Sequence, residues 1–232
     1  MLTVPLLGPR GDGLDTLRYV LFVVSLVTSV IYLGRTGGAW YPAMPWLKAV
    51  PVGALALLTA VSIPGVPLLG VFLVLALVLS TLGDIFLALK DEKRWFVFGL
   101  GSFLLAHLFY IAIFGFVVIN FGARVDEARL IATVMVVVLA GGLFMRLKPS
   151  LAEMTGPVAI YMAVIVAMVA GALMAPGTGP WIPLGAILFM VSDAMIAISR
   201  FQKPFAGVHQ LIWATYYMAQ YFLMVGILRG GA

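Results

Sequence analysis

Residues 66–89 read VPLLGVFLVLALVLSTLGDIFLAL and contain a single ionisable side chain, Asp84. A helix needs about 20 mostly apolar residues to cross the hydrocarbon core of a bilayer, and this stretch is long enough. The stretch therefore predicts a transmembrane helix that carries one carboxyl group inside it.

The rest of the chain has the composition of a membrane protein. Its 232 residues are 63% hydrophobic and 10% charged, with a mean hydropathy of +1.15. Soluble domains carry about 25% charged residues, so lipid is the solvent that fits this chain. The net charge is +5, and the basic residues lie in short loops between apolar stretches. Their position is explained by orientation in the membrane and argues against nucleic-acid binding.

The hydropathy pattern predicts an all-α, polytopic membrane bundle of about eight helices, folded as one integral membrane domain over residues 1–232. Short connections between the spans imply antiparallel neighbours in sequence. The second span is short, and Pro51 and Gly53 interrupt it. The predicted spans are roughly 17–34, 47–62, 66–89, 96–119, 128–146, 155–175, 181–199 and 206–228.

Basic residues predict the orientation. Five lie on one side, namely Arg10, Arg18, Arg124, Arg129 and Arg229. Nine lie on the other, which should be cytoplasmic, so both termini should face outward. These nine are Arg35, Lys48, Lys90, Lys93, Arg94, Arg146, Lys148, Arg200 and Lys203.

A second intramembrane aspartate, Asp193, lies in the seventh span. Asp84 precedes Lys90 by six residues and Asp193 precedes Arg200 by seven. At about 1.5 Å per residue, both carboxyl groups lie roughly 9–10 Å inside the same charged boundary. A shift of 109 residues aligns the two aspartates and also places His107 opposite Tyr216, which suggests a weak four-plus-four parallel repeat.

Charged groups inside a membrane are costly and usually functional. Two carboxyl groups in one polar cavity would not both ionise easily, so one would act as a proton donor beside a proton acceptor. Such a pair supports hydrolysis by general acid and general base. The alternative is that each aspartate only bonds a neighbouring helix or is hydrated near the interface.

Further polar residues of the spans extend the candidate site, each with a structural alternative. His107 and Tyr110 share one helix face, as do Tyr216 and Gln220. The alternatives are packing for the histidine and the tyrosines, and bonding to the backbone for serine. The two histidines of the chain are too few for a histidine-based metal site, and it has no cysteine. The predicted site residues beyond the aspartates are Lys48, Ser80, His107, Tyr110, Tyr161, Ser192, Tyr216 and Gln220.

Two ordered motifs resemble those of the YhhN-like lysoplasmalogenases. The first is STLGD at 80–84, followed by Phe98, Gly101, Phe103, Ala106, His107 and Tyr110. The second is FMVSD at 189–193, followed by Arg200, Phe201 and the stretch TYYMAQ at 215–220. One departure concerns Lys48, which precedes Ala49, Val50 and Pro51 where the family tends to have Lys-Pro.

The resemblance implies an integral membrane hydrolase, in the cell membrane if the source is bacterial. It would cleave the vinyl ether of a lysoplasmalogen, a single-chain phospholipid, into a fatty aldehyde and a glycerophospho-headgroup. No metal or organic cofactor would be required. Asp84 and Asp193 would be acid and base in either order, and the other site residues would position water or bind the glycerol and headgroup. An apolar channel between helices would hold the chain.

Other functions of paired membrane aspartates stay open. A proton-coupled transporter, or a membrane protein that only binds lipid, would use the same residues. An intramembrane aspartyl protease is disfavoured because Leu82 and Gly83 precede Asp84 where that class has Gly-x-Gly-Asp. A structural role without chemistry is the remaining alternative.

Overall fold

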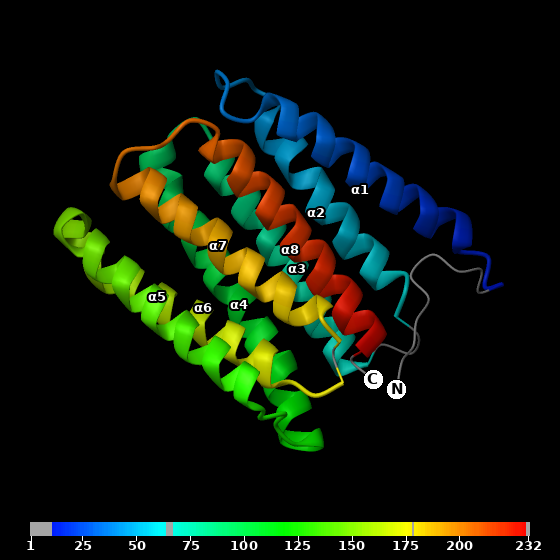
Figure 1. Cartoon of the computed structure of the whole chain (residues 1–232). Helices are drawn as coiled ribbons and strands as arrows, with labels where there is room; N and C mark the ends of the chain where they lie inside the picture. Colours follow the sequence, from blue (N-terminus) through cyan, green and yellow to red (C-terminus); the bar gives the residue numbers. More distant parts are fainter. Residues whose placement is uncertain (1–10, 64–66, 178, 231–232) are drawn as a thin grey trace.

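The computed structural model describes residues 11–63, 67–177 and 179–230 and confirms the all-α class (Figure 1). Arg10 and the predicted span start at Val66 lie outside the described residues. The described chain forms eight α-helices and one short 3-10 helix, η1. They are α1 Asp15–Arg35, α2 Met44–Ala60, α3 Leu68–Ala88, α4 Glu92–Phe121, α5 Glu127–Leu151, η1 Ala152–Met154, α6 Thr155–Met174, α7 Trp181–Phe201 and α8 Val208–Gly230.

The helices make a polytopic membrane bundle, as expected from composition. Six helical segments of the described chain are long and apolar enough to cross a membrane. One of them runs over Glu127–Met174 and contains both α5 and α6, and α2 is shorter than a full crossing at 17 residues. Eight crossings, the side of each terminus and the single-domain division therefore stay predictions.

Local sequence explains where several helices begin, bend and end. The side chains of Asp91 and Asp126 accept backbone N–H groups at the starts of α4 and α5, as N-cap residues do. Between α5 and α6 the chain reverses at Ala152, whose φ of 45° lies in the left-handed region. The expected interruption at Pro51 is wrong, because α2 continues through it. The carbonyl that Pro51 carries accepts a hydrogen bond of 2.8 Å from Ser25 of α1.

Helices that follow one another in sequence pack together except for α4 and α5, which do not contact each other among the described residues, although the short connection predicted that they would. Helices α3 and α7 lie toward the middle of the bundle (Figure 1). Helix α3 contacts α2, α4 and α8, while α7 contacts α8, α6 and α5. The α1–α2 pair lies at one edge of the bundle and the α5–α6 pair at the other (Figure 1). Each of the two aspartate-bearing helices thereby packs against three other helices on one side, and this sets the position of the site.

Candidate active site

Asp84 on α3 is almost fully buried and has two polar partners. Its carboxylate accepts a hydrogen bond of 2.7 Å from the hydroxyl of Tyr216 on α8, and the Lys48 ammonium on α2 lies 3.4 Å from its other oxygen. The exposed fraction is 1% for the Asp84 side chain and 15% for that of Lys48. A charge removed from water in this way requires a partner, and Lys48 supplies it.

Gly83 explains how α3 presents Asp84 so close to α4. A Cβ atom at position 83 would lie 2.6 Å from the ring of Phe103, so the ring packs against the helix only because residue 83 is glycine. Phe103 also packs edge-on against Tyr216, the hydrogen-bond partner of Asp84. One aromatic ring thus fixes both the helix and the tyrosine that hold this carboxylate.

Asp193 on α7 has a different environment. The hydroxyl of Tyr161 on α6 donates a hydrogen bond of 2.5 Å to Asp193 Oδ2, and His107 Nε2 on α4 lies 3.7 Å from the same oxygen. His107 Nδ1 is 2.6 Å from the carbonyl oxygen of Phe103. Because a carbonyl only accepts, a neutral His107 carries its proton on Nδ1 and turns the Nε2 lone pair toward Asp193.

Both aspartates line one polar cavity of about 460 Å³, so the structure brings together the two residues that the sequence placed at one depth. Lys48, Ser192 and Tyr216 line the same cavity. Its walls come from α1, α2, α3, α4, α7 and α8, and from the loop at residues 36–38. The cavity therefore joins side chains from both halves of the chain.

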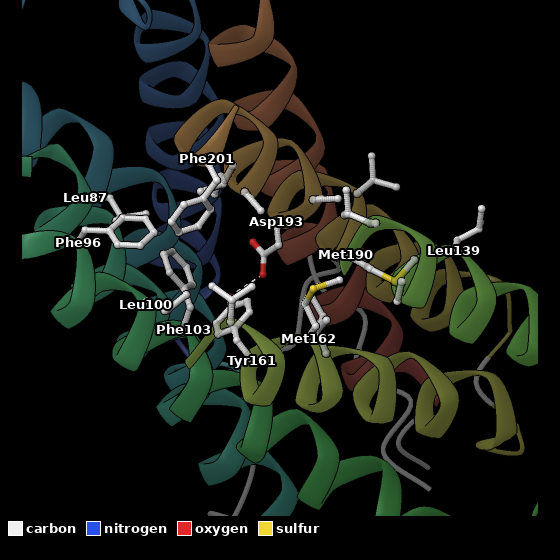
Figure 2. Close-up of a pocket in the computed structure, with 18 residues that line it drawn as sticks. Leu87, Phe96, Leu100, Phe103, Leu139, Tyr161, Met162, Met190, Asp193 and Phe201 are labelled. Atoms are coloured by element: carbon white, nitrogen blue, oxygen red, sulfur yellow. Dashed lines mark hydrogen bonds between the residues drawn. The ribbon is translucent and has the colours of Figure 1, made fainter. Parts of the chain in front are cut away.

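A second, apolar pocket of about 240 Å³ adjoins the first and lies mainly between α4, α5, α6 and α7. Figure 2 shows the Asp193 carboxylate pointing into it, with leucine, phenylalanine and methionine side chains on either side. Asp193 and Phe103 are among the residues that line both cavities, whereas Asp84 lines only the polar one. Asp193 thus lies at the junction of a polar and an apolar compartment.

The remaining predicted residues lie behind these walls or bond elsewhere. The Tyr110 hydroxyl donates a hydrogen bond of 2.7 Å to Gln220, and both side chains are fully buried. The Ser192 hydroxyl donates to the backbone carbonyl of Ile212, which is the structural alternative for that serine. Ser80 Oγ, His107 Nε2 and Gln220 Nε2 are buried with no hydrogen-bond partner among the described residues. Buried polar atoms of this kind are usually satisfied by ordered water or ligand.

Sequence reasoning used Arg200 as a topology marker and as part of the second motif but did not predict it as a site residue, yet it lines the polar cavity. Its guanidinium lies 4.8 Å from the centre of the Phe96 ring. The signal for Arg200 was its spacing, because seven residues after Asp193 is about two helical turns and so the same helix face.

Within the described residues, no group of three or more histidine, aspartate or glutamate side chains is arranged to hold a metal ion.

The pairing of each aspartate crosses the two halves of the chain. Asp84 of the first half bonds Tyr216 of the second, and Asp193 of the second lies beside His107 of the first. The shift of 109 residues that aligns the aspartates also aligns His107 with Tyr216. A parallel repeat would produce this exchange of partners, although the repeat itself stays a prediction.

Comparisons with known proteins match the chain to one protein family and to several curated relatives. The model of the YhhN family matches residues 44–227, and no solved structure matches the chain. A lysoplasmalogenase of Mycobacterium tuberculosis is 37% identical over 161 residues, which cover 68% of this chain and 61% of that protein. The human lysoplasmalogenase TMEM86B is 33% identical over 66% of this chain and 62% of its own length. The bovine lysoplasmalogenase TMEM86A is 29% identical over 90% of this chain and 87% of its own. The match therefore spans less than two thirds of the mycobacterial relative.

Proposed function

The chain belongs to the YhhN family, and from that premise we propose that it hydrolyses the vinyl-ether bond of lysoplasmalogens. The observation that carries the proposal is the position of Asp193 at the junction of the polar and apolar cavities. A lysoplasmalogen has its vinyl ether at the matching point, between a polar glycerophospho-headgroup and a long hydrocarbon chain. The chain would occupy the apolar pocket, and the headgroup would lie in the polar cavity near Arg200.

Three features favour Asp193 as the general acid. Acid cleavage of a vinyl ether starts with protonation of the carbon beta to oxygen, which lies on the chain side and so nearest the apolar pocket that Asp193 lines. Among the described residues, the basic side chain within ion-pairing distance of Asp193 is His107, with no lysine or arginine. A neutral His107 directs a lone pair at this carboxyl group, which suits a protonated Asp193.

Asp84 is suited to the opposite role. Lys48 supplies a positive charge beside it, which stabilises the ionised form, whereas a tyrosine hydroxyl donates to each aspartate and does not distinguish them. An ionised Asp84 in the polar cavity would orient the attacking water and stabilise the adjacent oxocarbenium ion electrostatically. The pairing of one neutral and one charged carboxyl group resembles the arrangement that glycosidases use for a similar cation.

The proton transfers balance over one turnover. Asp193 protonates the beta carbon, and the alpha carbon becomes part of an oxocarbenium ion. Water adds to the alpha carbon and gives one proton to Asp84. This addition converts the oxocarbenium ion into a hemiacetal. The carbon–oxygen bond to glycerol then breaks as Asp84 returns its proton to the leaving oxygen and the hemiacetal hydroxyl reprotonates Asp193. The products are an aldehyde and a glycerophospho-alcohol, and one water is consumed.

Incubation of the purified protein with a lysoplasmalogen in D2O tests the proposal. We expect release of an aldehyde that carries one deuterium on the carbon next to the carbonyl, in a single configuration, because a fixed acid delivers it to one face. The control is a lysophospholipid with the same chain in an ester, which should not be cleaved. Equal cleavage of both lipids would indicate a general lysophospholipase. Proton-coupled uptake without any aldehyde would favour the transporter alternative.

Tyr161→Phe is expected to lower kcat by about tenfold, because the hydroxyl fixes the Asp193 carboxyl group and a hydrogen bond to such a group contributes about 1.5 kcal/mol. The measurement is the rate of aldehyde release at saturating substrate. Tyr217→Phe on α8 is the matched control, since its hydroxyl bonds Ser25 and lies away from both cavities. An equal loss in both variants would contradict the assigned role of Tyr161.

A further inference from the structure

The apolar pocket has an exposed rim on one side. Of its described lining residues, Leu139 and Val191 are the two with exposed side chains, at 62% and 38%. Leu139 belongs to α5 and Val191 to α7, whereas the other lining side chains are buried or half-buried. The pocket is therefore open between these two helices, toward the lipid.

Packing between α5 and α7 is concentrated at one end of the pair. Leu147 and Leu151 near the end of α5 form a small buried cluster in which Ala197 and Phe201 of α7 take part. Leu139 lies midway along α5 and Val191 midway along α7. Both are about 15–18 Å from their helix ends, which places the opening near the middle of the bilayer.

The volume of the pocket leads to the same conclusion. Pockets that enclose drug-sized ligands hold about 300–1,000 Å³, whereas this one holds about 240 Å³. A long alkyl chain that starts at Asp193 would not fit inside, so its distal part must leave the protein. Figure 2 shows Leu139 at the far side of the pocket from Phe96, with Asp193 between them.

We propose that the hydrocarbon chain of a single-chain lipid reaches the site sideways from the bilayer between α5 and α7. The end of that chain stays in the lipid through the same opening during turnover. This inference rests on the proposed function for the identity of the lipid. It makes Leu139 and Val191 the residues that set access of long chains, and it predicts little discrimination among chains longer than the pocket.

The first test narrows the opening. Leu139→Trp and Val191→Trp are each expected to lower kcat/KM for a long-chain lysoplasmalogen, relative to a short-chain analogue whose chain ends inside the pocket. The ratio should fall about tenfold or more, the scale of steric misfit in an apolar pocket. Val138→Trp and Leu184→Trp are the controls, because both positions are exposed on the same helices and neither lines the pocket. An unchanged ratio in the Leu139 and Val191 variants would overturn the proposal.

A second test does not depend on turnover. A saturated ether lysophospholipid with a photoreactive diazirine at the end of its chain should cross-link near Leu139 and Val191 in detergent, and excess unlabelled lipid should compete. Competed cross-links that lie only on other helices would show that the chain ends elsewhere, and the opening would be wrong. If the protein cross-links at α5 and α7 but releases no aldehyde, the proposed function is contradicted and the lateral opening is still supported.

Discussion

Asp193→Asn is expected to lower kcat for vinyl-ether cleavage by a factor of about 10²–10⁴, the range that general acid catalysis contributes. Asparagine has nearly the same shape and still accepts the Tyr161 hydrogen bond, but it has no proton to give to carbon. Substrate binding should persist because the apolar pocket and the polar cavity are unchanged. A saturated ether analogue measures that binding, and thermal unfolding in detergent measures the fold.

Addition of azide distinguishes the catalytic roles of the two aspartates. Azide attacks an oxocarbenium ion without a general base, so Asp84→Asn should regain substrate consumption when azide is added. Asp193→Asn should not, because no oxocarbenium ion forms without the acid. The reverse pattern would exchange the assigned roles. A fully active Asp193→Asn protein would contradict the proposed acid–base pair.

Depth in the membrane was predictable from the sequence because it depends only on distance along a helix. Counting back from Lys90 and Arg200 placed Asp84 and Asp193 at one level, and both line the same cavity. The helical periods also placed Tyr216 and Gln220 on one face of α8, where they bond Asp84 and Tyr110. These inferences need a helix and its ends, which hydropathy supplies.

Pairings between helices were not predictable, because they depend on how each helix is rotated about its axis. Three tyrosines were candidates for the site, and packing directs Tyr161 to Asp193, Tyr216 to Asp84 and Tyr110 to Gln220. Lys48 fell outside the usual motif pattern, yet it lies beside Asp84. Ser192 is adjacent to Asp193 in sequence but bonds the backbone of α8. Even the helix through Pro51 depends on packing, since neighbouring helices offset the cost of a proline there.

Lys48→Met is expected to destabilise the fold by about 3–5 kcal/mol, the usual loss when one partner of a buried ion pair is removed. Asp84 keeps only 1% of its side chain exposed, so its charge depends mainly on the ammonium. Activity should fall as well, because a buried Asp84 without its cationic partner favours the neutral form and is then no base. Denaturant unfolding in detergent micelles gives the free energy. Lys148→Met is the control, since that lysine is exposed on α5 and its loss should change stability little.

The double variant Lys48→Met with Asp84→Asn separates the structural role of the pair from its chemical role. Asparagine carries no charge and still accepts from Tyr216, so most of the stability lost in Lys48→Met should return. Activity should stay as low as in Asp84→Asn alone, because the base is missing in both. Restored stability with restored activity would make the Lys48–Asp84 pair a structural element only. No restoration of stability would show that Lys48 acts through contacts other than Asp84. The expected combination, a restored fold without turnover, shows that the stability lost in Lys48→Met comes from the uncompensated charge of Asp84 and that turnover needs Asp84 itself.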